Sequence, residues 1–122
     1  MVARKVAARL KPNSLTEFAN LMEREILPWL RKQEGFLDLI ILAVPHCREV
    51  ATISFWDEKA NAHSYNSDGY PEALKMLGTL LDGPPYVKTF EVVGSTFQGL
   101  GLAPQAQNLV HQSTSPQLGF SS

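Results

Sequence analysis

Residues 35–56 read GFLDLIILAVPHCREVATISFW, and this stretch decides the fold. It predicts two strands, over 36–44 and 50–56, joined by a tight polar turn. Neither strand alternates cleanly between apolar and polar residues, as a strand with one wet face should. In the first strand, one side carries Phe36, Ile40, Leu42 and Val44, with Asp38 as its polar interruption, and the other carries Leu37, Leu39, Ile41 and Ala43. In the second strand, one side carries Ala51, Ile53 and Phe55, and the other carries Val50, Thr52, Ser54 and Trp56. We therefore expect both faces of the sheet to be covered.

The sequence before the hairpin predicts a strand and a helix. Residues 2–10 form the strand, with Val6, Ala8 and Leu10 on one face and Lys5, Ala7 and Arg9 on the other. Ser14 and Glu17 have the spacing of a capping box at a helix start. The apolar stripe of that helix is Leu15, Phe18, Ala19, Met22, Ile26, Trp29 and Leu30. Pro28 is expected to kink the helix, and Gly35 to end it with a left-handed cap.

Helical sequence and a last strand follow the hairpin. A helix capped by Asp57 is expected to run up to an interruption at 66–69. A further helix begins near Tyr70, and its stripe is Tyr70, Ala73, Leu74, Leu77 and Leu81. The run Asp-Gly-Pro-Pro at 82–85 ends it. Residues 86–97 are rich in Val, Thr, Phe and Tyr and predict the last strand.

The order of elements predicts an α+β protomer of the ferredoxin-like βαββαβ type. Such a fold has a four-stranded antiparallel sheet with its helices on one face. The other face would expose about five or six large apolar side chains, each worth roughly 1.5 to 3 kcal/mol when buried. The total, on the order of 10 kcal/mol, is comparable to the net stability of a domain. We therefore expect a homodimer, in which two sheets pack face to face as a dimeric α+β barrel.

The composition predicts one domain at 1–98 and a tail at 99–122. The tail is rich in Gln, Ser, Pro and Gly, and it is expected to pack on its own or the partner subunit. It is also the competing candidate for covering the sheet.

Composition excludes several partners and cofactors. The 122 residues carry a net charge of −1 without a basic stripe, so no nucleic-acid partner is expected. No segment approaches the roughly 20 apolar residues of a membrane helix, so no membrane partner is expected. The single cysteine, Cys47, excludes an internal disulfide and fits the cytoplasm. His46 and Cys47 are too few ligands for a zinc site, and no nucleotide-binding glycine loop occurs. We expect no metal and no cofactor.

Three short segments resemble the antibiotic biosynthesis monooxygenase family, which belongs to the dimeric α+β barrel superfamily. They are Arg31–Phe36, the strand end Ser54–Trp56 and the helix start Trp56–Ala60, and the similarity extends over residues 2–97. The resemblance implies a ferredoxin-like protomer, a two-sheet dimer, and a pocket between sheet and helices. It implies activities that include cofactor-free oxidation of quinol-type aromatics and haem breakdown, although many members have no assigned activity.

The resemblance also argues against haem breakdown. The haem-degrading relatives use an asparagine on the first strand, this tryptophan, and a histidine on the later helix. Alignment on Trp56 and on Ser67-Asp68 puts the histidine position at Leu74 and the asparagine position at or near Ala8. Only the tryptophan is retained, so haem degradation by that route is not expected.

His63 and Trp56 are the candidate catalytic residues. The imidazole of a histidine titrates near neutral pH, so His63 is a candidate base for a phenolic or carbon-bound proton. Trp56 ends a strand just before a helix and offers a flat apolar surface and an N–H donor. The structural alternatives are a surface histidine and a core tryptophan at an element boundary.

Tyr65, Asn66, Tyr70, Phe18 and Met22 are the candidate substrate-binding residues. The first three lie near His63 in sequence and carry groups that can hydrogen-bond a substrate carbonyl. Phe18 and Met22 lie on the first helix and are candidates for the wall of the same pocket. The alternatives are that the polar residues cap and pack the helix break, and that Phe18 and Met22 belong to the core.

These observations give three hypotheses of function. The first is a small cofactor-independent monooxygenase-like enzyme that acts on a small aromatic or quinol-type molecule between sheet and helices. The second is a non-catalytic dimeric α+β barrel that binds a small ligand or a partner protein. The third is a structural dimer in which the chain after Gly99 clasps the neighbouring subunit.

Overall fold

The computed structural model describes residues 1–96 of the chain. Contacts divide the chain into a unit Met1–Glu91 and a second unit that begins at Val92, of which residues 92–96 are described and have no helix or strand. The boundary expected at residue 98 and the tail expected at 99–122 lie outside the described residues. The elements of the first unit are β1 (Val2–Arg9), α1 (Leu15–Leu21), η1 (Met22–Ile26), α2 (Leu27–Arg31), β2 (Phe36–Ala43), β3 (Glu49–Trp56), α3 (Lys59–Asp68), α4 (Tyr70–Leu77), η2 (Gly78–Leu80) and β4 (Tyr86–Glu91).

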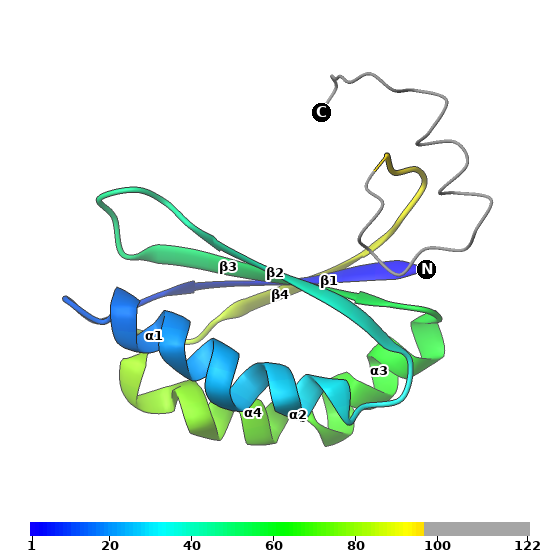
Figure 1. Ribbon diagram of the computed structural model, residues 1–122, viewed down its shortest axis with the longest axis horizontal. Helices are drawn as coiled ribbons and strands as arrows, with labels where there is room; N and C mark the ends of the chain where they lie inside the picture. The colour runs from blue at the N-terminus through cyan, green and yellow to red at the C-terminus, as the bar shows by residue number, and fades with distance from the viewer. Residues whose placement is uncertain (97–122) are drawn as a thin grey trace. The chain divides into compact units, whose positions relative to one another are not determined.

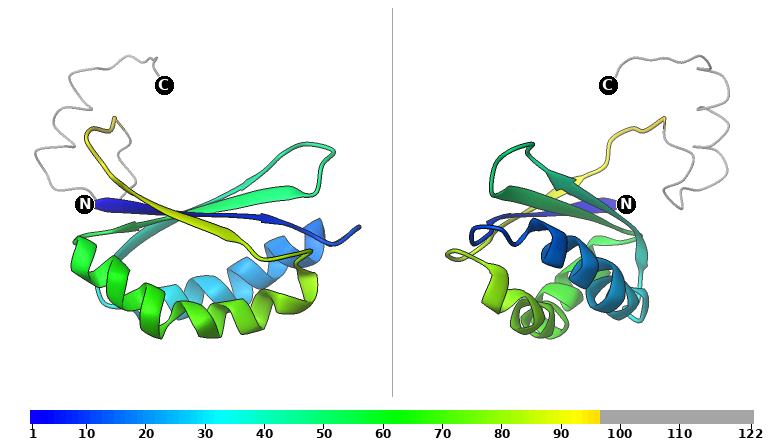
Figure 2. Two further views of the ribbon diagram at one scale, coloured as in Figure 1. Left: turned by 180° about the vertical axis from the view of Figure 1, so that it is seen from behind. Right: turned by 60° about the vertical axis from the view of Figure 1, so that its left-hand side comes forward.

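The four strands form one antiparallel sheet in the order β2-β3-β1-β4. All the helices lie on one face of it, as Figure 1 and both views of Figure 2 show. The predicted ferredoxin-like α+β fold is therefore confirmed. We call the face under the helices the inner face and the opposite face the outer face.

The register of β1 and β3 assigns their residues to the two faces. Directly opposite residues share a face, and successive residues alternate between faces. The inner-face pairs are Val2↔Trp56, Arg4↔Ser54, Val6↔Thr52 and Ala8↔Val50, and the outer-face pairs are Ala3↔Phe55, Lys5↔Ile53 and Ala7↔Ala51. The inner face packs on a buried core that includes Phe18, Met22, Ile26 and Leu30 from the first helical run and Ala62, Tyr65 and Ala73 from α3 and α4.

The predicted faces of β2 are wrong at Phe36, because the strand contains a bulge. The register shifts between Phe36 and Asp38, so that Phe36 pairs with Trp56 while Asp38 pairs with Phe55. An extra residue in one strand moves the preceding side chain to the other face. Phe36 therefore packs edge-on against the ring of Trp56 on the inner face, with ring centroids 5.6 Å apart.

The first helical run differs from prediction because its middle turn is a π-helix, η1. The buried residues Phe18, Met22, Ile26 and Leu30 recur at every fourth position, whereas Leu15 and Ala19 of the predicted stripe are exposed. Four-residue steps drift by about 40° each around an ordinary helix with 3.6 residues per turn. The wider turn of η1 reduces this drift. It lies just before Pro28, which lacks the N–H that an α-helix needs, so the wide turn accommodates the interrupted hydrogen-bond pattern.

The predicted side-chain caps are not formed. Ser14 is the N-cap residue of α1, but its hydroxyl donates to the carbonyl of Pro12 at 3.4 Å instead of capping the helix. The N-cap residue of α3 is Glu58 instead of Asp57. The carboxylate of Asp57 accepts a hydrogen bond of 2.9 Å from the Asn61 amide, which engages it outside the cap position.

Three other boundaries decide how the inner face is covered. Gly35 has the predicted left-handed conformation, with φ 83°, but α2 ends at Arg31 with Lys32 as its C-cap residue, so Gly35 closes the turn before β2 instead of capping the helix. The interruption expected at 66–69 is confined to Gly69, between α3 and α4. The last strand ends at Glu91 instead of residue 97. Its partner β1 begins at Val2, which pairs with Glu91, so the sheet offers no pairing beyond that point.

Candidate functional site

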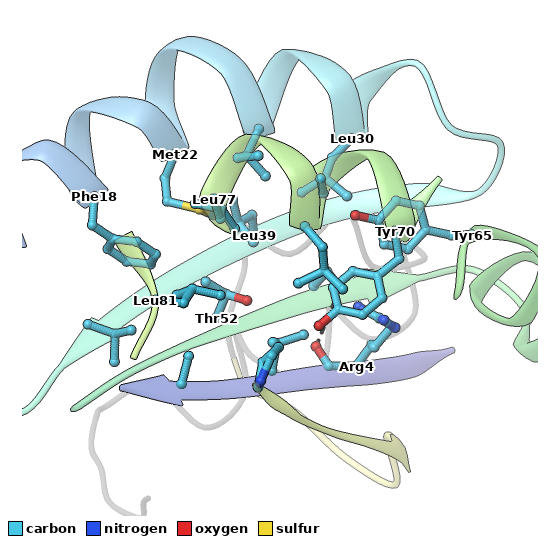
Figure 3. A pocket seen from close by; sticks show the side chains of 18 residues that line it. Arg4, Phe18, Met22, Leu30, Leu39, Thr52, Tyr65, Tyr70, Leu77 and Leu81 are labelled. Carbon is cyan, nitrogen blue, oxygen red and sulfur yellow. Dashed lines mark hydrogen bonds between the residues drawn. The ribbon is translucent and has the colours of Figure 1, made fainter. Parts of the chain in front are cut away.

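A cavity of about 50 Å³ lies between the inner face and the helices. Figure 3 shows its lining: Phe18 and Leu81 lie at one end, and Arg4, Tyr65 and Tyr70 gather at the other. Pockets for drug-sized molecules usually measure roughly 300 to 1,000 Å³, and a buried water needs roughly 10 to 15 Å³. The cavity in this state therefore has room for a few water molecules, and an aromatic ring would enter only if lining side chains moved.

Within residues 1–96, Arg4 is the one charged residue that lines the cavity. Its inner-face position on β1 leaves it only 2% exposed. One guanidinium nitrogen, Nη2, donates a 2.7 Å hydrogen bond to the side-chain oxygen of Asn66. The guanidinium carbon lies 4.0 Å from the ring centroid of Tyr70 and 5.1 Å from that of Tyr65. Two aromatic faces thus take the place that a carboxylate usually holds beside a buried arginine.

The charge of Arg4 has no counter-ion among residues 1–96. The ion pairs of this part of the chain join Arg9 and Arg48 to Asp82, and Lys75 to Glu72. Burial lowers the pKa of Arg4, and the neighbouring Tyr65 and Tyr70 act in the opposite direction. A buried charge without a counter-ion is unfavourable. A negatively charged group that enters the cavity would compensate the charge of Arg4.

Two buried donors at this end of the cavity have no hydrogen-bond partner within the described residues. They are Nε of Arg4 and the hydroxyl of Tyr70. The Arg4 guanidinium lies close enough to the Tyr70 hydroxyl to oppose the rise in its pKa both by its charge and as a hydrogen-bonding group, but neither Arg4 Nε nor the Tyr70 hydroxyl makes a hydrogen bond with full geometry. A buried donor without an acceptor costs about 1 to 3 kcal/mol. The site therefore presents two unsatisfied donors from side chains that are in contact with each other.

Both tyrosines are held in their neutral form. Burial raises the pKa of Tyr65 to about 12, although the charge of Arg4 acts against this shift. Burial also raises the pKa of Tyr70, again opposed by Arg4. At neutral pH the two phenols are therefore donors and acceptors of hydrogen bonds, and neither neutralises the guanidinium.

Trp56 lies behind the cavity. It is fully buried, its Nε1 donates to the hydroxyl of Ser54 at 2.9 Å, and it is not a lining residue. Its ring stacks on Tyr65 with centroids 5.0 Å apart, so Trp56 reaches the cavity through Tyr65. Direct contact between Trp56 and a substrate remains a prediction.

The remaining predicted residues divide into two groups. Tyr65, Tyr70, Phe18 and Met22 line the cavity together. His63 is exposed on α3, and neither His63 nor any other histidine, lysine, aspartate or glutamate belongs to the described lining. Asn66 does not line the cavity either, and it binds Arg4 instead. The catalytic role of His63 remains a prediction.

Arg4 is the residue that the sequence reasoning missed. Its signal was present: Arg4 has the same parity in β1 as Val6 and Ala8, so strand alternation places it on the inner face with them. Composition alone favours an exposed position for an arginine, because charged side chains are mostly exposed unless they are paired.

Residues 1–96 contain no cluster of three or more potential metal ligands. His46 and Cys47 are exposed in the hairpin turn, where His46 has a positive φ of 61°. Within the same residues, no helix has the length and apolar character required to cross a membrane.

No family model matches the sequence, and no curated protein matches it. Solved structures do. A candidate antibiotic biosynthesis monooxygenase from Bordetella bronchiseptica superposes with a TM-score of 0.66 at 15% identity, over 75% of this chain and 96% of that one. The fold is that of the antibiotic biosynthesis monooxygenases.

Two structures with this monooxygenase fold have a described activity. A monooxygenase from Streptomyces coelicolor, solved with the ligand nanaomycin D, matches with a TM-score of 0.65 at 20% identity, over 77% of this chain and 88% of that one. A cofactor-independent oxygenase from Streptomyces nogalater matches with a TM-score of 0.64 at 14% identity, over 77% of this chain and 94% of that one.

A protein of unknown function from Nitrosomonas europaea matches equally well, with a TM-score of 0.65 at 19% identity, over 77% of this chain and 90% of that one. The likeness therefore establishes the fold and leaves the activity open.

Proposed function

We propose that the protein is a cofactor-independent, monooxygenase-like enzyme that acts on a small aromatic or quinol-type molecule bound between the sheet and the helices. The observation that carries this proposal is the apolar cavity whose far end is formed by Arg4, Tyr65 and Tyr70. The fold supports it, since the Streptomyces nogalater protein with this fold is a cofactor-independent oxygenase.

The proposed chemistry uses the substrate as the source of electrons. An ionised quinol gives an electron to O2, and the two radicals combine so that one oxygen atom bonds to a ring carbon as a peroxide. That carbon then loses its hydrogen as a proton and the O–O bond breaks, which leaves a carbonyl on the ring. The outer oxygen leaves as water with this proton and the phenolic proton. The protein has to favour the ionised substrate and to exclude bulk water around it. Arg4 is the proposed partner of the substrate anion, and His63 is the proposed acceptor of its proton. Trp56 is proposed to hold Tyr65 in place from behind.

Substrate entry requires the cavity to widen. Met22 is the lining residue best suited to this change, because methionine has an unbranched and flexible side chain. It also begins the π-helical segment η1, and such segments often lie at functional sites. We therefore propose that widening occurs on the side of the first helical run.

Filling the cavity tests the proposal. Ala73 is buried in the lining, so Ala73→Leu should reduce O2 uptake with a panel of naphthalene and benzene diols to the rate of the buffer. Ala60→Leu adds the same group at an exposed position of α3 and should leave O2 uptake unchanged. Circular dichroism should show both variants folded. Equal O2 uptake by the two variants, or no uptake above the buffer rate by the unmodified protein, would contradict the proposal.

A binding function without catalysis is the second candidate, and one observation favours it. The described cavity lining contains no carboxylate or imidazole that could accept a proton from the substrate. In a Trp29→Phe variant, which leaves Trp56 as the remaining tryptophan of the sequence, a binding protein would show saturable quenching of the fluorescence by aromatic ligands, because Trp56 stacks on the lining residue Tyr65. Quenching without any O2 uptake would decide for this candidate.

We also propose that the working form is a homodimer, joined through the outer faces of two sheets. Apolar side chains are exposed there in the single chain, namely Leu42, Val44, Tyr86 and Phe90. Leu42→Glu should weaken self-association at least about tenfold in analytical ultracentrifugation, since it would place a carboxylate in the apolar contact. Leu15→Glu is the matched control, because both leucines are 45% exposed and Leu15 lies on α1. The cytoplasm expected from Cys47, an exposed free thiol, belongs to the same proposal.

A further inference from the structure

The buried end of the cavity contains a positive charge with no compensating negative charge. Arg4 is 2% exposed, and no carboxylate within residues 1–96 forms an ion pair with it. Removing water from a charge is unfavourable, and the attraction of that charge for an anion is stronger away from water. A site in this condition is poised to bind a negative group.

The geometry of Arg4 leaves one edge of its guanidinium available. The Nη2 side is engaged by Asn66 at 2.7 Å. The ring centroids of Tyr70 and Tyr65 lie 4.0 and 5.1 Å from the guanidinium carbon and 6.2 Å from each other, so the two rings lie on adjoining sides of the guanidinium and not on its opposite faces. Nε lies on the remaining edge, buried and without an acceptor, and the Tyr70 hydroxyl nearby is in the same state. One ligand oxygen, or the two oxygens of a carboxylate, can accept from both groups.

We propose that Arg4 and Tyr70 form an anion-recognition site, and that the ligand is a small aromatic acid whose ionised oxygen accepts from Arg4 Nε and the Tyr70 hydroxyl. The inference deepens the proposed function, because it names the chemical class that the same cavity selects. It also stands without oxygenation, since a binding protein would use the same contacts.

The rest of the lining defines the body of the ligand. Beyond Arg4 and the tyrosines, the cavity walls are mostly aliphatic and aromatic, with Phe18 and Leu81 at the opposite end (Figure 3). An inorganic anion would leave this surface without a partner. A single-ring acid places its charge at Arg4 and its hydrocarbon against Phe18, and the small size of the cavity favours one ring over several.

Selectivity follows from the unsatisfied donors. A neutral ligand of the same shape provides a weaker acceptor for the guanidinium, and hydrogen bonds to charged groups are worth about 1.5 to 3 kcal/mol against about 1 for neutral ones. A cationic ligand is repelled by Arg4. The expected order of affinity is therefore acid, then neutral amide, then amine.

Binding of benzoate, benzamide and benzylamine to the full chain tests this order by isothermal titration calorimetry. The unmodified protein should bind benzoate about 2- to 30-fold more tightly than benzamide. Arg4→Met should lose this preference while it keeps its affinity for benzamide. Lys5→Met is the matched control, because Lys5 is the next residue of β1 and lies on the outer face, and it should bind as the unmodified protein does.

A chromogenic phenol distinguishes the two sources of the ionised oxygen. The absorbance of 4-nitrophenol reports its ionisation, and binding at Arg4 should lower its apparent pKa in the unmodified protein and in Lys5→Met. In Arg4→Met the apparent pKa should not fall. If the apparent pKa of 4-nitrophenol falls and benzoate also binds, the site accepts both ionised phenols and carboxylates. If benzoate binds and the apparent pKa does not fall, the site accepts carboxylates. Either result supports the proposal.

Three results would overturn the proposal: equal affinity of the unmodified protein for benzoate and benzamide, unchanged benzoate affinity in Arg4→Met, or no saturable binding of any probe. If Arg4→Met does not fold, Tyr70→Phe decides, because it removes one donor and keeps the ring; benzoate affinity should fall about tenfold. Benzoate binding without O2 uptake on any diol would remove the proposed oxygenation and leave the anion site intact.

Discussion

Arg4 and Lys5 are neighbours in β1 and carry the same charge, yet they occupy opposite environments. Arg4 lies on the inner face, buried under the helices, beside two tyrosine rings. Lys5 lies on the outer face and is exposed. Strand alternation alone separates them. Because an arginine is seldom buried without a partner, its position identifies the face on which a ligand is expected, and the exposed lysine carries no such information.

The two faces differ in the same way in their apolar residues. The inner face is packed by helices of its own chain, which leaves a small cavity at the centre. The outer face exposes Leu42, Tyr86 and Phe90 in the single chain. Substitutions on the inner face should therefore change folding at any protein concentration. Substitutions on the outer face should change association.

The largest expected effect is that of Trp56→Ala on the inner face. Trp56 is fully buried and contacts Phe36 and Tyr65, so its removal should lower the free energy of unfolding by about 3 to 5 kcal/mol, measured by urea denaturation. Tyr86→Ala on the outer face, where the side chain is 67% exposed, should change it by less than about 0.5 kcal/mol in dilute, monomeric protein. Similar losses in the two variants would remove the distinction between the faces.

The second largest expected effect is a loss of stability at alkaline pH, which arises from Tyr65 on the inner side of the sheet. Burial raises the pKa of Tyr65 to about 12 from its ordinary value of 10.0, so the folded state holds the phenolic proton more tightly than the unfolded state. The associated stability is fully present below pH 10 and is lost as pH rises towards 12. The free energy of unfolding, measured by denaturation, should fall by about 2 to 3 kcal/mol over this window. Tyr65→Phe should flatten the pH dependence, and an equally steep decline in that variant would contradict this assignment.

Gly35→Ala should have an intermediate effect, because Gly35 leads into the bulge that brings Phe36 to the inner face. Its φ of 83° is strained for alanine, and an added Cβ would collide with Asp57 and Asn61. A loss of about 1 to 3 kcal/mol is expected in thermal or urea unfolding. Gly78→Ala is the control, since Gly78 is helical and an added Cβ meets no atom within 4 Å; it should be neutral or stabilising. A loss at Gly78 equal to that at Gly35 would rule out the conformational explanation.

The smallest expected change in stability is that of Arg4→Met, and its sign is informative. Replacing a buried charge that has no counter-ion by an apolar side chain should leave the free energy of unfolding unchanged or raise it by up to about 2 kcal/mol. Lys5→Met should have little effect in dilute protein. A clear destabilisation by Arg4→Met would mean that Arg4 serves the fold through Asn66 and the tyrosines.

Periodicity predicted the sheet and helices well, because the hydrophobic pattern of residues 35–56 and the order of elements leave few alternatives. It failed where a local irregularity changes the pattern. The bulge after Phe36 reverses a face, and the π-turn η1 replaces a three-and-four spacing by a spacing of four. Both depend on backbone hydrogen bonds that side-chain patterns do not encode. The predicted caps at Ser14 and Asp57 are wrong because each side chain binds another group. The Ser14 hydroxyl donates to the Pro12 carbonyl, and the Asp57 carboxylate accepts from the Asn61 amide.

The candidate site was predicted in part for a similar reason. Phe18, Met22 and Tyr70 belong to the predicted helix stripes that face the sheet, so periodicity places them together. Tyr65 lies on α3, for which no stripe is predicted, and only its closeness to His63 in the sequence points to it. Trp56 shares that face, but the ring of Tyr65 lies between it and the cavity, and this depth depends on packing. His63 falls on the exposed side of α3, one residue after the buried Ala62. The alternation of faces along β1 is by itself sufficient to place Arg4 on the inner face.

The most direct measurement of the central claim is the NMR signal of the Arg4 Nε–H group during a titration with benzoate. The signal can be assigned by its absence in Arg4→Met. Acceptance of a hydrogen bond by the carboxylate should move the proton resonance downfield and slow its exchange with water, and benzamide should have a much smaller effect. A benzoate complex in which the methyl signals of the cavity shift while the Arg4 Nε–H signal stays in place would contradict the claim.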